Sequence, residues 1–173
     1  MELFSWDAEQ FRFLIHVAVA MLLGGVVGAD REITGKSAGL RTHMLVAGAS
    51  SLFVSTGMMV IQAFESGVPT EALRGDPIRI VHGVITGISF LGAGTIIARP
   101  QDDRVKGLTT AASIWFVAAI GVCVALSQII LAIGATILVL IALRCLRSVE
   151  EWLRQRYERI YAPWRRDRES TTE

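Results

Sequence analysis

Residues 107–143 read GLTTAASIWFVAAIGVCVALSQIILAIGATILVLIAL, a run of 37 residues without one Asp, Glu, Lys or Arg. An α-helix rises about 1.5 Å per residue, so crossing roughly 30 Å of hydrocarbon takes about 20 apolar residues. This run is therefore long enough for two membrane-spanning helices. The polar pair Ser127-Gln128 marks the turn between them.

Three shorter charge-free runs precede it, and they contain 17, 23 and 19 residues. Each fits one spanning helix, because a chain inside a bilayer must satisfy its own backbone hydrogen bonds. The sequence therefore predicts an all-α, polytopic membrane protein with five transmembrane helices. The predicted helices lie at about residues 11–29, 44–64, 78–98, 108–126 and 128–145.

Two parts of the chain differ in composition. Residues 1–145 form the predicted five-helix transmembrane domain, and residues 146–173 form a basic amphipathic cytoplasmic helix followed by a disordered tail. Aromatic and arginine side chains in the tail suit a lipid headgroup region. Because 52% of the residues are hydrophobic and the polar segments are too short to enclose a core, the sequence excludes a secreted, nucleic-acid-binding or ordinary cytosolic protein.

The net charge of +1 hides a strong asymmetry between the two sides of the membrane. The segments 30–43, 99–107 and 144–173 carry 14 Lys and Arg residues, against 3 on the opposite side. Basic residues accumulate in cytoplasmic loops. We therefore predict that the N-terminus lies outside and the C-terminus lies in the cytoplasm.

The two predicted cytoplasmic loops resemble each other. A shift of 68 residues gives six identities over residues 23–46, among them Arg31 with Arg99 and Thr42 with Thr110. Both copies run in the same direction. The pattern predicts a parallel repeat in which helix pairs 1–2 and 3–4 are related and the two loops meet at one end of the molecule.

Glycines recur at four-residue spacing in the first and third predicted helices. Small residues at this spacing let another helix approach closely inside a membrane. Two interpretations stay open: packing within the chain, or a homodimer face or flexible gate. The glycines concerned are Gly24, Gly28, Gly83, Gly87, Gly92 and Gly94.

The two loops and the adjoining helix ends carry a cluster of polar side chains. Ionisable groups at membrane depth are costly, so they pair with one another or face a cavity. One alternative is a solvated loop. Another is a magnesium site at Asp30 and Glu32, since Mg²⁺ favours one or two carboxylates plus waters, although neighbouring cations compete. The cluster comprises Asp30, Arg31, Glu32, Lys36, Arg41, Thr42, His43, Arg104, Lys106, Thr109 and Thr110.

Two further histidines, His16 and His82, lie within predicted spans. Such a residue either bonds to a neighbouring helix or relays protons. The sequence contains no nucleophile–base–acid set, no phosphate loop and no zinc spacing. We therefore predict that the protein is not an enzyme and holds no cofactor, apart from the Mg²⁺ considered above.

Three segments, at residues 31–46, 87–94 and 105–115, together resemble the MgtC/SapB family of bacterial inner-membrane proteins. The resemblance implies a five-helix membrane domain and a link to growth at low magnesium, acid tolerance and survival of pathogens inside host cells. One member of that family is described as restraining the ATP synthase. Long members continue into an ACT-like cytoplasmic domain, and this chain is expected to be a short member without it.

These observations favour a non-enzymatic membrane protein that modulates magnesium, acid-stress or envelope homeostasis through protein contacts. Its expected partners are membrane lipids, a second copy in a homodimer, and another membrane complex such as the ATP synthase; nucleic acid is not expected. The alternative is a small transporter or channel for Mg²⁺ or another small solute, with its site between the two loops. A third class, a purely structural scaffold, would depend on the glycines.

Overall fold

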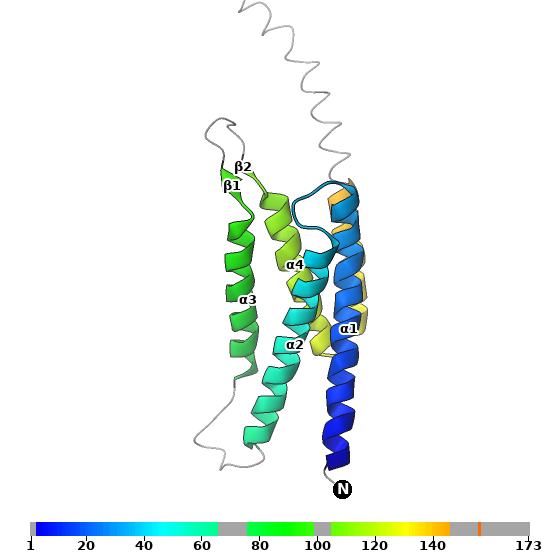
Figure 1. Cartoon of the computed structure of the whole chain (residues 1–173), viewed down its shortest axis with the longest axis vertical. Helices are drawn as coiled ribbons and strands as arrows, with labels where there is room; N and C mark the ends of the chain where they lie inside the picture. Colours follow the sequence, from blue (N-terminus) through cyan, green and yellow to red (C-terminus); the bar gives the residue numbers. More distant parts are fainter. Residues whose placement is uncertain (1–2, 66–75, 99–104, 146–155, 157–173) are drawn as a thin grey trace, which may run out of the picture. The chain divides into compact units, whose positions relative to one another are not determined.

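The computed structural model describes residues 3–65, 76–98 and 105–145, together with Arg156 (Figure 1). It divides into two compact units, Met1–Ile137 and Leu138–Glu173, and each is considered by itself. The elements are α1 (Leu3–Ile33), α2 (Leu40–Glu65), α3 (Pro77–Gly94), β1 (Ile97–Ala98), β2 (Val105–Lys106), α4 (Leu108–Ala125) and a further helix, Ile129–Cys145.

Helices α1 to α4 are long and apolar enough to cross a membrane. The helix Ile129–Cys145 is also apolar but stands at the short end of the range that spans a bilayer. Within the described residues, strand structure is confined to the antiparallel pair of β1 with β2. The prediction of an all-α polytopic membrane protein is confirmed.

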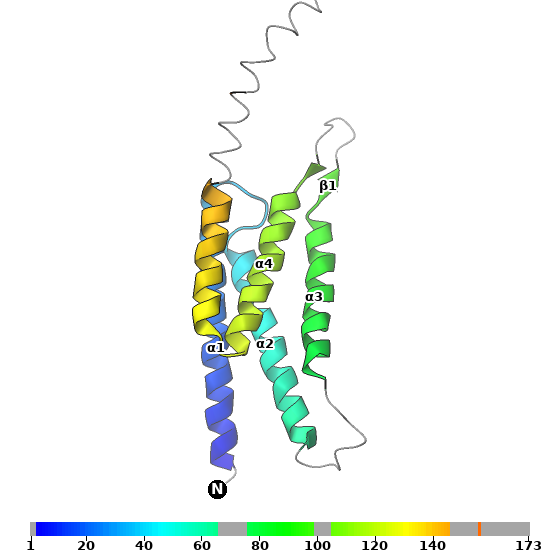
Figure 2. The same ribbon diagram turned by 180° about the vertical axis from the view of Figure 1, so that it is seen from behind.

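The four labelled helices form two antiparallel hairpins. Figures 1 and 2 show α1 and α3 running in one direction and α2 and α4 in the other. The loop between α1 and α2 therefore lies at the same end of the bundle as the β1–β2 hairpin. The two polar loops thus share one end, as the predicted parallel repeat requires.

The core of the bundle lies between α1, α2 and α4, and the α1–α2 contact is the most extensive. Each helix buries an apolar stripe toward the other two. Helix α3 packs outside this core against α2 and α4, and buries only Val84 and Gly92. The fully buried apolar side chains of the core are Ala20, Val27, Ala47, Ile114, Val117 and Val124.

Four predicted helix ends were wrong. Helix α1 extends over Leu3–Ile33 instead of 11–29, α2 begins at Leu40 instead of residue 44, and α3 ends at Gly94 instead of residue 98. The errors in α1 and α2 arose because a charged side chain ends a hydrophobic run without ending a helix, whose backbone continues into the polar interface. The error in α3 has a different cause: Thr95 caps α3, and β1 then begins.

The short loop after α1 is closed by a glycine. Gly35 has a φ of +64°, and its N–H donates to the carbonyl of Glu32 at 3.0 Å. The N–H of Lys36 donates to the carbonyl of Arg31, also at 3.0 Å. This pair of bonds is the Schellman motif, in which a left-handed residue satisfies the last carbonyls of a helix. It turns the chain sharply back toward α2.

The glycines of α1 and α3 do not play the same role. A Cβ atom on Gly24 would lie 2.6 Å from the carbonyl oxygen of His43, and one on Gly28 would lie 2.8 Å from Cα of Leu40. By contrast, Cβ atoms on Gly83 and Gly87 would meet nothing within 4 Å. The first pair of glycines therefore packs against α2 within the chain, whereas the second pair faces open space.

The contact between α3 and α4 matches the one between α1 and α2 under the 68-residue shift. Gly24 approaches His43, and its counterpart Gly92 approaches Ala111, the counterpart of His43. A Cβ atom on Gly92 would lie 3.7 Å from Cβ of Ala111, which is ordinary contact. The geometry agrees with the predicted repeat, and the second hairpin is the more loosely packed.

Most of the residues of the predicted amphipathic tail, 146–155 and 157–173, lie outside the described part of the chain. The division into a membrane domain at 1–145 and a tail at 146–173 therefore stays a prediction.

Replacing Gly24 with Ala should destabilise the bundle by about 1–3 kcal/mol, because the new methyl group forces α2 away from α1. The matched change Gly83→Ala should be neutral or slightly stabilising, since its methyl group enters open space and alanine favours helices by up to about 1 kcal/mol. Thermal unfolding of both variants in detergent micelles checks this. Equal losses of stability would contradict the packing described here.

Candidate functional site

Arg31 is buried near the C-terminal end of α1, with 4% of its surface exposed. Its Nη2 donates a hydrogen bond to Oγ1 of Thr110, in the first turn of α4, at 3.0 Å. A guanidinium taken out of water must find hydrogen-bond acceptors within the protein. This bond therefore fastens the start of α4 to the end of α1, across 79 residues of sequence.

His43 is fully buried in the first turn of α2. Its Nδ1 lies 2.8 Å from the backbone carbonyl oxygen of Gly39, and its Nε2 lies 3.1 Å from Oγ of Ser113 on α4. The Ser113 hydroxyl also lies 2.9 Å from the carbonyl oxygen of Thr110. One side chain of α2 is thus joined to the same turn of α4 that binds Arg31.

We call Arg31, His43, Thr110 and Ser113 the polar joint. It connects α1, α2 and α4 at the end of the bundle that carries the two loops. A serine hydroxyl next to an imidazole is also the pairing used in nucleophilic catalysis. Here Ser113 is 2% exposed and His43 is 0% exposed, so a substrate has no access to the hydroxyl. The arrangement can hold the three helices together.

The two carboxylates of the predicted metal site lie in different surroundings. Asp30 is buried beside Arg31, with 6% of its surface exposed. Glu32 is exposed, and its Oε2 accepts a hydrogen bond from the backbone N–H of Leu40 at 2.8 Å, at the start of α2. Among the described residues, no group of three His, Cys, Asp or Glu side chains is placed to hold a metal ion.

Gly39 leaves room for this carboxylate in its observed position. A Cβ atom at position 39 would collide with Oε2 of Glu32. The glycine therefore leaves the space in which Glu32 reaches the first N–H groups of α2. Acidic groups at this position also interact favourably with the helix dipole.

The remaining members of the predicted polar cluster that the structure describes do not enter the joint. Thr42 is half-buried, and Arg104 falls outside the described residues. The side chains at the surface are Lys36, Arg41, Lys106 and Thr109. The structure thus separates the predicted cluster into an internal set and an external basic set.

The two isolated histidines are separate from the joint. His82 is exposed on α3, whereas Nδ1 of His16 is buried on α1. Within the described chain, four buried polar side-chain atoms have no hydrogen-bond partner: Nδ1 of His16, Nε of Arg31 and the hydroxyls of Ser51 and Ser55. The sequence reasoning missed the two serines; their four-residue spacing within an apolar run was the available signal.

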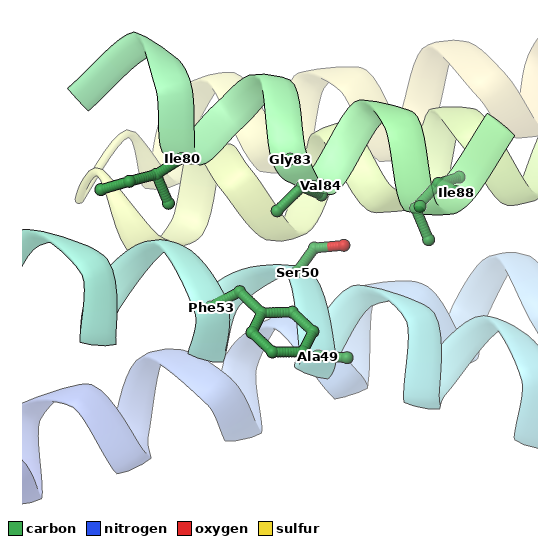
Figure 3. A pocket seen from close by; sticks show the side chains of 8 residues that line it. Ala49, Ser50, Phe53, Ile80, Gly83, Val84 and Ile88 are labelled. Atoms are coloured by element: carbon green, nitrogen blue, oxygen red, sulfur yellow. The ribbon is translucent and has the colours of Figure 1, made fainter. Parts of the chain in front are cut away.

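A crevice separates the middle of α3 from α2 (Figure 3). Its volume is about 420 Å³, and Ser50 supplies a hydroxyl to its lining, which donates to the carbonyl of Val46. Near its start, α3 contacts α2, because Ile80 lies against Gly57. The lining residues are Ala49, Ser50, Phe53, Ile80, Gly83, Val84, Gly87 and Ile88.

These features define a small polytopic helical membrane protein whose loop-end polar residues are built into its helix packing. Residues 17–152 match the model of the MgtC family, and the chain belongs to that family. No solved structure matches it.

Three relatives illustrate the relationship. Protein SrpB of Synechococcus elongatus is 39% identical over 166 residues, which cover 91% of this chain and 86% of the relative. The protein named putative magnesium transporter YhiD of Escherichia coli K12 is 37% identical, with 76% of this chain and 59% of the relative covered. Protein MgtC of Salmonella typhimurium is 36% identical, with 84% and 57% covered. The chain thus spans nearly all of SrpB and somewhat over half of the other two.

Replacing Thr110 with Val should destabilise the protein by about 1–2 kcal/mol, because the buried guanidinium of Arg31 loses its acceptor while the side-chain shape is kept. Thr109→Val is the matched control, since Thr109 is exposed one residue earlier on the same helix. Thermal unfolding in detergent measures both. A loss as large at Thr109 as at Thr110 would show that the Arg31 bond contributes nothing specific.

Proposed function

We propose that this chain is a non-enzymatic protein of the bacterial inner membrane that modulates magnesium, acid-stress or envelope homeostasis. It acts through contacts with other membrane proteins, and a second copy of the chain is the simplest partner. Membership of the MgtC family supports the connection with magnesium, as does the name of the relative YhiD. The contacts are proposed from the surface of α3.

The single observation that supports contact with another membrane protein is a pair of glycines on α3 with open space beside them. Gly83 and Gly87 line the crevice beside α2, and Cβ atoms on them would meet nothing within 4 Å. A glycine inside a helix costs up to about 1 kcal/mol relative to alanine. Lipid chains gain nothing from a glycine, whereas a second helix can approach it closely. The crevice therefore suits a transmembrane helix.

The surface next to the crevice supports the same proposal. Phe53 on α2 is 64% exposed at the crevice, and Phe90 on α3 is 86% exposed. Aromatic side chains contribute large contact areas to protein interfaces. A partner helix seated in the crevice would cover the Phe53 ring.

We propose the orientation from the charge distribution, with the N-terminus outside and the C-terminus in the cytoplasm. The two polar loops share one end of the bundle, and the basic residues concentrate on their side of the membrane. In this orientation Lys36 and Arg41, both exposed, face the cytoplasm. They would contact anionic headgroups or the cytoplasmic face of a partner.

The second candidate is a small transporter or channel for Mg²⁺. One geometric observation favours it, since Asp30 is a buried carboxylate at the loop end of α1. The hydrogen bond between Arg31 and Thr110 argues against a path for Mg²⁺ at this position, because it joins α1 to α4 across the space that an ion would need.

The double substitution Gly83→Leu and Gly87→Leu should abolish self-association, because two leucine side chains fill the crevice. Crosslinking in native membranes and light scattering in detergent measure the oligomer. Thr86→Leu is the control for an added leucine, since it places one at an exposed position of the same helix outside the crevice lining. An unchanged oligomer in the double variant would refute the proposed contact face.

Purified protein in liposomes loaded with a magnesium-sensitive dye should show no Mg²⁺ entry above empty liposomes. A modulator that works through contacts moves no ion by itself. A magnesium flux that disappears in Asp30→Asn and persists in Thr86→Leu would establish the transporter instead.

A further inference from the structure

His43 takes part in a chain of three hydrogen-bond contacts that is closed to solvent. The contacts join the carbonyl oxygen of Gly39 to Nδ1 at 2.8 Å, Nε2 to Oγ of Ser113 at 3.1 Å, and that Oγ to the carbonyl oxygen of Thr110 at 2.9 Å. All three distances lie within the range of true hydrogen bonds.

Each hydrogen bond needs one proton, and the donors can be counted. A carbonyl oxygen only accepts, so Nδ1 carries a proton toward Gly39. The Ser113 hydroxyl has a single proton, which goes either to the carbonyl oxygen of Thr110 or to Nε2. If it goes to Nε2, a neutral imidazole suffices and the Thr110 contact is not a hydrogen bond. All three contacts are hydrogen bonds at once only when Nε2 carries a proton of its own, which makes the ring an imidazolium.

We infer that His43 is a proton-binding site built into the contact between α2 and α4. With the proton bound, the imidazolium donates to Gly39 and to Ser113, and Ser113 donates to Thr110. Without it, the Ser113 hydroxyl rotates and donates to Nε2, while Nδ1 keeps its proton and its bond to Gly39. The same heavy-atom positions serve both states, so the helices need not separate when the proton is exchanged.

Neither state leaves a polar group of the contact without a partner. When Ser113 turns away from Thr110, that carbonyl oxygen remains within the backbone bonding of α4, which continues through this turn. The two states thus differ in the direction in which the Ser113 hydroxyl group donates its hydrogen. The role of this hydroxyl differs from that of Ser50, whose hydroxyl bonds only within its own helix, to Val46.

The charges around this site come from one side. Helix α1 supplies the buried Arg31, bonded to Thr110, together with the buried Asp30 next to it. The described part of α4 supplies only neutral groups around the ring. A bound proton therefore adds a second positive charge close to the guanidinium, with Asp30 as the neighbouring anion. In the described parts of the two loops and the adjoining helix ends, the exposed charged side chains are Glu32, Lys36, Arg41 and Lys106.

Proton uptake consequently changes the electrostatic state of the polar joint. Burial and the neighbouring Arg31 guanidinium oppose the added charge, while the two acceptors, the carbonyl oxygen of Gly39 and Oγ of Ser113, favour it. This proton site does not depend on the proposed function, since it rests on the hydrogen-bond geometry around His43.

The chain contains three histidines, which makes a direct test possible. The double substitution His16→Gln and His82→Gln leaves His43 as the sole histidine. We expect ¹⁵N-histidine NMR of this protein in lipid nanodiscs, over about pH 5 to 9, to show an imidazolium at the acid end and an Nδ1–H imidazole at the alkaline end. A neutral imidazole at every pH would overturn the inference.

Ser113→Ala removes the acceptor of the Nε2 proton. Ser113 also donates to the neutral ring, so only the difference between the two bonds shifts the titration. Because the bond to the charged ring is the stronger one, the midpoint should move toward acid by up to about one pH unit. Ser113→Thr keeps a hydroxyl and should keep the midpoint. Ser50→Ala is the matched control, because it removes a buried hydroxyl that does not touch the ring. A midpoint unchanged in Ser113→Ala, or moved equally by Ser50→Ala, would refute the assignment.

Discussion

The close approach of α1 to α2 at Gly24 and Gly28 is the constraint on which the rest of the bundle depends. Cβ atoms at these positions would collide with the backbone of α2 around Leu40 and His43. Hydrophobic burial does not drive helices together in lipid, so such close backbone packing has to supply the association. It also places His43 in the core and brings Arg31, one turn beyond Gly28, to the start of α4.

The membrane spans could be predicted from the sequence because charge is excluded from hydrocarbon. The helix ends could not, since the backbone of a helix tolerates charged residues where the chain enters the interface. Helix α1 therefore continues through Asp30 to Ile33 and stops at the left-handed Gly35. Turn chemistry, and not the end of the apolar run, decides where this helix ends.

The composition of the site was partly predictable and its connections were not. Arg31, His43 and Thr110 all belong to the predicted cluster, because a charged or polar residue at a helix end inside a membrane needs a partner. Which partner each finds depends on the register of α4 against α1 and α2. Ser113 became the partner of His43 through that register, which no local sequence pattern specifies.

The glycine motifs show even more clearly that a sequence pattern does not specify which elements pack together. Gly24 with Gly28 and Gly83 with Gly87 have the same spacing, yet the first pair is packed and the second is open. Spacing indicates that a helix can be approached closely, but not which helix approaches it. Only the three-dimensional arrangement separates packing within the chain from a surface available to a partner.

The two halves of the repeat differ at the position of this polar contact. Under the 68-residue shift, Ala111 of α4 stands where His43 stands in α2. The imidazole reaches across to Ser113 and fastens α2 to α4, whereas a methyl group cannot make an equivalent bond. The corresponding glycine contact is also looser, since a Cβ on Gly92 would sit 3.7 Å from Ala111. The spacing of the repeat is therefore kept without its polar bond, and α3 packs outside the core that α1, α2 and α4 form.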